Sequence, residues 1–198
     1  RVDPEKGIVA LDLGKGGEAT LPRNEQVPGE TFTEGQTVQV YVVDVLATDR
    51  GPRVTISRTH PGLVKRMFEL EVPEIYDGTV EVKAIAREAG ARTKMAVWSK
   101  NPDVDPVGAC IGARGVRVEK IVQELNGEKI DVIRWSEDIT EFISAALSPA
   151  KVVKVELLPG ETKSCRVTVP DHQLSLAIGN KGQNVRLCAH LTGYNIDI

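Results

Sequence analysis

The first sixty residues alternate apolar and polar positions with the two-residue period of β-strands. Such runs cover residues 7–13, 38–43 and 53–57. Glycine-rich or proline-containing turns follow at 14–17 and 48–52. Short strands joined by such turns, with no helical spacing between them, predict a small all-β barrel.

After His60-Pro61-Gly62 the apolar spacing becomes helical and strand-like in turn, and one order of elements occurs twice. That order is helix, strand, strand, helix, loop, helix, strand. The pattern places the first set at 63–70, 79–87, 92–99, 107–111, 118–125 and 129–135, and the second at 139–147, 152–158, 164–169, 174–178, 185–189 and 194–198. Each set predicts a three-stranded sheet covered by helices, which is an α+β layer. Because no flexible linker separates the two sets, we expect them to dock rigidly.

The loop between the two later helices is a Gly-x-x-Gly in both sets. The first copy is Gly112-Ala113-Arg114-Gly115 and the second is Gly179-Asn180-Lys181-Gly182. With 18 glycines in 198 residues the bare spacing should arise by chance about once or twice, and Gly14 and Gly17 also fit it. That third pair lies between strands and is interpreted as a turn. The other two carry weight because each lies between helices and the whole surrounding unit is duplicated.

This arrangement predicts two loops that hold the backbone of single-stranded nucleic acid. A glycine has no Cβ, so a nucleic-acid backbone can approach closely. The following helix presents unpaired N–H groups and the positive end of its dipole to the loop, while a basic side chain inside the loop can contact a phosphate. The candidate RNA-binding residues are Ile111, Gly112, Ala113, Arg114, Gly115, Arg117, Ile178, Gly179, Asn180, Lys181, Gly182, Gln183, Asn184 and Arg186.

Several of these side chains have a second interpretation. Arg117, Lys120 and Arg186 could be solvated charges on helices rather than RNA contacts. Gln183 and Asn184 fall in the first helical turn facing the loop, where such residues also serve simply as helix-start residues. Outside the loops, Trp98 and Trp135 fall on strands, which favours packing over base stacking.

Composition and charge limit the other possibilities. A net charge of −3 is mildly unfavourable for a nucleic-acid binder, so the basic residues at the two loops matter more than the total. The three cysteines have no metal-ligand spacing and fit a reducing cytosol, and we expect no metal or cofactor. No apolar run approaches the length of a membrane span. A start without Met or a signal-peptide pattern suggests an excised piece of a cytoplasmic protein.

Family resemblances agree with this organisation. Residues 19–22, 34–38 and 54–58 resemble the S-one-type OB barrel, although Gln36 stands where that family usually has an acidic residue and the first strand is missing. The two later units resemble KH domains of the bacterial type II topology, in which the extra helix and strand come first. We therefore expect a multidomain chain: an N-terminally truncated OB-type barrel at 1–60 and KH domains at 61–135 and 136–198. The barrel is as well suited to a spacer or docking role as to RNA contact, since only Phe32 and Tyr41 offer aromatic faces.

The order of these modules, together with the runs 70–75, 84–90, 108–112 and 177–186, resembles the NusA family of bacterial transcription factors. That resemblance implies single-stranded RNA as the partner, held as nascent transcript during pausing, termination and antitermination. It also implies RNA polymerase as a partner, mainly through a region that this chain lacks, and further elongation or antitermination factors. An RNA-binding module of an RNA-degrading or ribosome-associated assembly is the alternative.

An enzyme is the rival class of function. A glycine-rich loop could hold a nucleoside triphosphate, but no Gly-Lys-Ser/Thr or Gly-x-Gly-x-x-Gly sequence is present. Asp103 and Asp105 flank prolines in a loop that has no further metal-ligand cluster. We therefore expect a protein that is not an enzyme.

Overall fold

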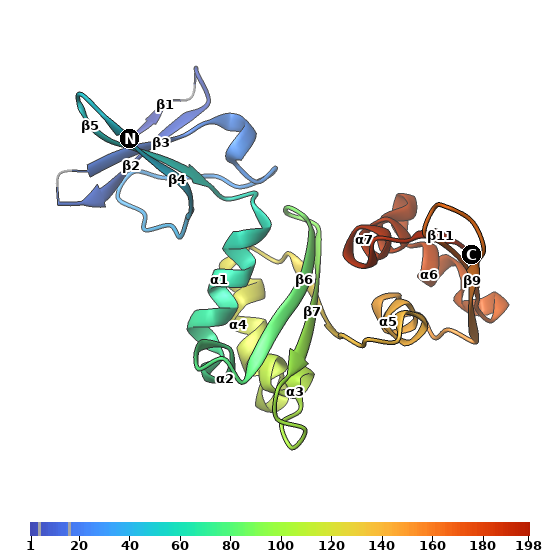
Figure 1. Ribbon diagram of the computed structural model, residues 1–198. Helices are drawn as coiled ribbons and strands as arrows, with labels where there is room; N and C mark the ends of the chain where they lie inside the picture. Colours follow the sequence, from blue (N-terminus) through green and yellow to red (C-terminus); the bar gives the residue numbers. More distant parts are fainter. Residues whose placement is uncertain (4, 16) are drawn as a thin grey trace. The chain divides into compact units, whose positions relative to one another are not determined.

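A computed structural model describes residues 1–3, 5–15 and 17–198 (Figure 1). The chain separates into two compact units, Arg1–Met67 and Phe68–Ile198, and each is described by itself. The first unit is rich in β structure and the second contains two KH-type α+β layers, which confirms the predicted fold class. The boundaries 1–60, 61–135 and 136–198 stay predictions.

The first unit contains two small antiparallel sheets. Strands β1 (Val2–Asp3), β2 (Ile8–Gly14) and β3 (Gly17–Leu21) form one sheet, and β4 (Tyr41–Thr48) pairs with β5 (Gly51–Ser57) in the other. A single 3₁₀ turn, Arg23–Glu25, follows β3. The predicted strand at 38–43 was placed too early, because β4 begins at Tyr41 and continues to a two-residue turn at Asp49 and Arg50.

The core of the first unit is small. Val9, Ala19, Leu21 and Ile56 are buried together, and Phe32 packs against them. Most of the large apolar side chains of β4 remain exposed. Phe32 therefore contributes to packing rather than offering a free ring.

Tyr41 and His60 stack on each other, with ring centroids 4.5 Å apart. The rings of Phe32 and Tyr41, which could have made the barrel a base-stacking surface, are thus both already in contact with the protein. The stacking argument for RNA binding by this unit is correspondingly weak.

The first KH layer is a sheet of β6 (Val80–Glu88), β7 (Arg92–Ser99) and β8 (Lys129–Arg134), in that order. Strands β6 and β7 are antiparallel, whereas β7 and β8 are parallel and are connected through helices. The helices are α1 (Pro61–Glu71), α2 (Pro73–Tyr76), α3 (Pro106–Ile111) and α4 (Val116–Glu124).

The second KH layer repeats this arrangement with shorter strands. Strands β9 (Lys154–Leu158), β10 (Ser164–Thr168) and β11 (Asn195–Asp197) form the sheet, with β10 and β11 parallel. Its helices are α5 (Ile139–Ala146), α6 (Leu174–Ile178) and α7 (Gln183–Thr192). The predicted strand at 152–158 starts at Lys154 instead, so Val152 and Val153 belong to the connection.

The two KH layers share one hydrophobic core. Ala86, Ala96 and Ile133 on the first sheet pack in the same buried cluster as α5 and α7, which contribute Phe142 and Leu187 among others. Two layers with a common core cannot separate without exposing apolar surface to water. The expected rigid docking therefore has a structural basis.

A buried polar network reinforces that junction. Asp131 on β8 accepts hydrogen bonds from Arg92 at 2.7 Å and from Lys94 at 2.9 Å. The same Lys94 ammonium donates to the carbonyl oxygen of Ser148, just after α5, at 2.6 Å. Burial lowers the pKa of Lys94, and the nearby Asp131 carboxylate opposes that shift. Lys94 thus connects the first sheet to the second KH layer.

Candidate nucleic-acid interface

The two Gly-x-x-Gly loops have the same backbone conformation. Gly112 has φ 78° and ψ 171°, and Gly179 has φ 81° and ψ 171°. The basic residue in each loop is left-handed, with φ 57° at Arg114 and φ 53° at Lys181. In each loop the amide of the second glycine donates to the carbonyl oxygen of the first at 3.1 Å. The sequence repeat is therefore also a repeat of geometry.

The first and second glycine of each loop differ in what surrounds them. A Cβ on Gly179 would lie 2.6 Å from the backbone nitrogen of Asn184, and one on Gly112 would lie 2.7 Å from Cγ of Arg117. A Cβ on Gly115 would meet nothing within 4 Å, and one on Gly182 would meet only an Arg186 nitrogen at 3.9 Å. All four glycines have a positive φ, but the first of each loop allows the loop to pack on the next helix, whereas the second has open space beside it. Only the second leaves room for a ligand.

Both loops lead into helices whose first turns have no side-chain cap. Helices α4 and α7 begin after Gly115 and Gly182, and neither glycine supplies a capping group. Helix α5, in contrast, is capped by Asp138, whose carboxylate accepts from the amide of Thr140 at 3.0 Å. Uncapped first-turn amides together with the helix dipole favour a phosphate at this position.

The basic side chains within the loops are accessible. Arg114 and Lys181 are exposed, and no described carboxylate forms a salt bridge with either. Ala113 and Asn180 beside them are also exposed. The structure therefore brings the loop backbone, one available cation and an open helix start together at each of the two positions.

Asn184 has a buried side chain that holds the structure behind the second loop. Its side chain is only 3% exposed, and its Nδ2 donates to the carbonyl oxygens of Leu147 and Ala177 at 3.0 and 2.9 Å. Its Oδ1 has no partner among the described residues. The burial and these hydrogen bonds indicate a structural role for this side chain, and an RNA contact by Asn184 stays a prediction.

Arg117 occupies the equivalent position in the first loop and has the same structural role. Its guanidinium donates to the carbonyl oxygen of Ala109 at 2.7 Å and forms a salt bridge with Glu74 at 2.9 Å. In both loops, then, the side chain five residues after the first glycine holds the preceding helix. Arg117 is partly exposed, but its charge already has a partner.

Arg186 and Lys120 are also paired with carboxylates. Arg186 forms two hydrogen bonds with Glu88, at 2.9 and 2.8 Å, and a third with the carbonyl oxygen of Lys181. The Arg186 hydrogen bond is the largest cause of the lowered pKa of Glu88. Lys120 lies 3.0 Å from Glu71. These side chains fit the alternative interpretation, in which they are charges satisfied on the protein surface.

A cavity of about 290 Å³ adjoins the second loop and is lined from both KH layers. Sequence reasoning identified Gly179, Asn180, Gln183 and Asn184 at this position but missed the remaining lining residues. Those residues are Ala91, Arg92, Lys129, Pro149, Ser175 and Leu176. Lys129 could have been noticed as a basic residue at the start of the strand that follows α4, but the pairing of the two layers was not visible in the sequence.

Two other sequence features that could have suggested a binding site, the third Gly-x-x-Gly and Asp105, have structural roles. Gly14 and Gly17 lie at the facing ends of β2 and β3, so this third Gly-x-x-Gly is a hairpin connection as predicted. Asp105 accepts from the amide of Val107 at 3.1 Å and caps α3. No described helix is long and apolar enough to cross a membrane.

The cysteines are buried thiols with no described partner cysteine. All three are free and buried. Burial raises the pKa of Cys110 and of Cys188 to about 12, and it raises the pKa of Cys165 as well. A thiol with such a pKa is almost wholly protonated at neutral pH and is a poor nucleophile.

Comparison with known proteins supports the same division of the second unit. Residues 58–135 match the model of the NusA-like first KH domain, and residues 139–198 match that of the NusA-like second KH domain. A solved structure described as APE1850 matches 68% of this chain and 94% of its own, with a TM-score of 0.50 at 20% identity, which indicates a shared fold.

Similar curated proteins are each named "Transcription termination/antitermination protein NusA". One from Halalkalibacterium halodurans is 59% identical over 96% of this chain and 50% of its own length. One from Thermus thermophilus is 53% identical over 99% of this chain and 50% of its own length. The chain thus spans about half the length of these relatives. With two successive matches to NusA-like KH domains and high identity along nearly its whole length, the chain belongs to the NusA family.

Proposed function

We propose that this chain binds a single strand of nascent RNA across its two Gly-x-x-Gly loops, as part of a transcription termination and antitermination factor. The observation that carries the proposal is the duplicated geometry: two loops with matching dihedral angles, each with an exposed cation and an uncapped helix start. KH loops clamp about four nucleotides each, so two clamps on one body suit a strand of about eight nucleotides or more.

The shared core of the two KH layers supports a single continuous site. Because the layers cannot reorient freely, binding at one loop places the neighbouring nucleotides near the other. The cavity of about 290 Å³ beside the second loop has Arg92 and Lys129 on its wall. The RNA strand would pass along this cavity from β8 to the second loop. The proposed action is binding without chemistry on the RNA.

The names of the relatives favour transcription over the ribosomal or RNA-degrading alternative. RNA polymerase is proposed as the protein partner, with contacts that involve parts of the longer relatives outside this chain. Other elongation or antitermination factors belong to the same proposal.

Fluorescence anisotropy with labelled 12-nucleotide RNA tests the site directly. Single-stranded RNA should bind more tightly than a duplex of the same sequence, and single-stranded DNA serves as a third probe. The variants Ala113→Asp/Arg114→Asp and Asn180→Asp/Lys181→Asp should each weaken binding about tenfold or more, since a like charge faces the phosphate. Folded loop variants with unchanged affinity would refute the assignment.

Lys15→Asp is a matched control for these variants. Lys15 lies inside the third Gly-x-x-Gly and has φ 53°, the same value as Lys181, but it sits in a hairpin. Its substitution changes the net charge by −2, compared with −3 for each double variant, at a lysine with the same φ as Lys181 and without touching a proposed clamp. An equal loss of affinity for Lys15→Asp would mean that the loop effects report net charge alone.

Salt dependence separates free from paired cations. Lys181→Ala should reduce the slope of log affinity against log salt by about 0.7, the value for one phosphate contact of a single strand. Arg186→Ala should change the slope by much less, because Glu88 already holds that guanidinium. Equal changes for the two variants would contradict the site as described.

A further inference from the structure

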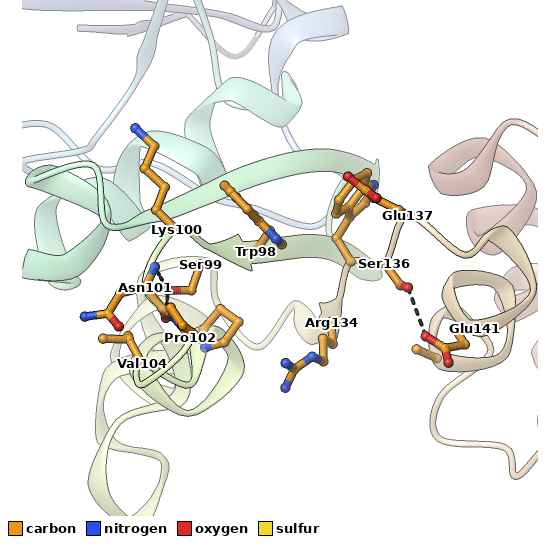
Figure 2. A pocket seen from close by; sticks show the side chains of 13 residues that line it. Trp98, Ser99, Lys100, Asn101, Pro102, Val104, Arg134, Ser136, Glu137 and Glu141 are labelled. Atoms are coloured by element: carbon orange, nitrogen blue, oxygen red, sulfur yellow. Dashed lines mark hydrogen bonds between the residues drawn. The ribbon is translucent and has the colours of Figure 1, made fainter.

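A second cavity, of about 550 Å³, lies at the ends of β7 and β8, at the opposite end of α3 from the first loop. It is built from three segments: the end of β7 with the loop that follows, the start of α3, and the passage from β8 into α5. Its lining residues include Trp98, Asn101, Pro106, Arg134, Trp135 and Glu141. Figure 2 shows the Trp98 side chain between the loop that carries Asn101 and the segment that carries Ser136.

This cavity contains both tryptophans of the chain. The Lys83 ammonium lies 4.6 Å from the ring centroid of Trp98 and 5.1 Å from that of Trp135, so one cation holds both indoles. Lys83 itself does not line the cavity. The two rings are therefore fixed from outside the cavity while both contribute to its wall, which is the arrangement of a preformed stacking surface.

Arg134 gives the cavity an available positive charge. It is exposed, and its guanidinium makes no salt bridge or hydrogen bond with a described residue. Lys100 on the opposite wall is paired with Glu81 at 3.3 Å. A planar guanidinium can both bind a phosphate and stack on a base.

The cavity also has an acidic side, which orients a ligand. Glu141 accepts a hydrogen bond from the hydroxyl of Ser136 at 3.0 Å, and Glu137 lies nearby on the same segment. Carboxylates repel phosphate but accept N–H donors. A bound nucleotide would therefore direct its phosphate toward Arg134 and an amino edge of its base toward α5.

Helix α3 connects this cavity to the proposed clamp. Pro106 at its start lines the cavity, and Gly112 follows directly after its last residue, Ile111. A helix of six residues is about 9 Å long, a span that a neighbouring nucleotide of the same strand can cover. A strand held by the first loop therefore passes within reach of the cavity.

From these observations we propose that the cavity takes an unstacked base of single-stranded RNA, next to the nucleotides held by the first loop. The proposal rests on the proposed function, because the same RNA occupies both sites. It adds a stacking site to a protein whose two loops are poor in aromatic residues. Trp98 and Trp135 would supply the ring surface and Arg134 the phosphate contact.

Intrinsic tryptophan fluorescence tests the proposal with no added label on the protein. Both emitters line the cavity, so a base stacked there should quench or shift the emission while anisotropy of labelled RNA reports binding independently. A 12-nucleotide single strand should change the emission. A four-nucleotide strand, which fills only one clamp, should change it less at equal occupancy.

Two variants locate the effect. Arg134→Ala changes an exposed residue and should weaken binding of the 12-nucleotide strand about fivefold to tenfold, with little effect on the four-nucleotide strand. Trp98→Leu should weaken it by a similar factor and reduce the quenching, with circular dichroism confirming that the variant is folded. Arg53→Ala, an exposed arginine on β5, is the matched control and should leave both signals unchanged.

The outcomes separate this inference from the proposed function. RNA that binds by anisotropy without altering tryptophan emission, in a protein whose Arg134→Ala variant binds normally, would refute the stacking site and leave the loop clamps standing. Absence of any RNA binding would remove both proposals. Emission that responds to a protein partner but not to RNA would also overturn the stacking site, in favour of a protein-binding cavity.

Discussion

Replacing Asn184 with leucine separates a buried structural role from an RNA contact. In the folded protein the side-chain amide donates to Leu147 and Ala177, and both carbonyls would lose this donor. The Ala177 carbonyl would become an unsatisfied buried acceptor, which costs about 1–3 kcal/mol, whereas the Leu147 carbonyl still accepts from the amide of Ala150 at 3.0 Å and loses one hydrogen bond worth about 1 kcal/mol. The Oδ1 atom has no partner among the described residues, so its removal relieves a cost of similar size. The net expectation is a loss of about 1 kcal/mol in the free energy of unfolding.

Urea unfolding followed by tryptophan fluorescence measures this loss in the relevant part of the chain. Both tryptophans belong to the second unit, and Trp135 packs against the core shared by the two KH layers. With a slope of about 2 kcal/mol per molar urea, the midpoint should fall by about 0.5 M. RNA affinity, measured well below the midpoint, should change much less than in the loop variants.

Asn180→Leu is the reciprocal control. It makes the same substitution four residues earlier, at an exposed position in the loop itself. Its effect on the free energy of unfolding should stay within about 0.5 kcal/mol, while RNA binding weakens. If Asn184→Leu instead left stability unchanged and abolished RNA binding, the buried role assigned here would be wrong and the RNA-contact interpretation would be restored.

Three further predictions concern other parts of the second unit. Gly179→Ala should destabilise the protein because the new Cβ meets backbone, whereas Gly182→Ala should be milder because it adds only positive-φ strain, about 1 kcal/mol; similar urea midpoints would contradict this. Burial alone would raise the pKa of Asp131, but the hydrogen bond from Arg92 and the charge of Lys94 lower it below 3.8. The free energy of unfolding that this carboxylate contributes is therefore present above pH 4 and is lost as the pH falls through the pKa of the folded state. Urea midpoints at pH 6 and 3 should therefore differ less in Asp131→Asn than in the wild type. Cys110 and Cys188, with pKa values of about 12, should resist a thiol-specific reagent at pH 8 until the protein unfolds; fast labelling in the native state would contradict their burial.

Local sequence patterns were sufficient for the order of elements in the two KH layers apart from the short helix α2, but they missed strands β1 and β3 of the first unit. Apolar spacing, prolines and glycine turns act over a few residues, so β7 was predicted with its observed limits, Arg92–Ser99. Among the strands that were predicted, the largest error was at β4, where Val38 to Val40 continued an apolar run but precede the paired segment that begins at Tyr41. Strand limits depend on the partner strand, and the pairing of β4 with β5 cannot be read from one strand alone.

The candidate site residues likewise differ in whether their role depends on local or on distant parts of the chain. The loop positions were identifiable because their geometry is local: two glycines, a basic residue and a helix start. Whether a side chain in the next turn faces RNA or the core depends on what packs there, and only the structure shows Leu147 beside Asn184 and Glu88 beside Arg186. The acceptors come from distant parts of the chain, so neither role could be inferred from the sequence around the loop.

The two sheets explain why the repeat forms one body. On the first sheet, Ala86 and Ala96 are small and apolar and lie under the helices of the second layer, and the nearby Lys94–Asp131 pair is buried with them. Register places Arg166 and Asp197 at the equivalent positions of the second sheet, where they are 60% and 71% exposed and 3.9 Å apart. Register also places the exposed Glu156 at the position that corresponds to Ala86, and a solvated charge in place of an apolar residue removes the driving force for another layer to dock. The first sheet therefore has a face that the second KH layer covers, whereas the corresponding face of the second sheet is exposed to water. The two KH layers form one body, which carries both Gly-x-x-Gly loops.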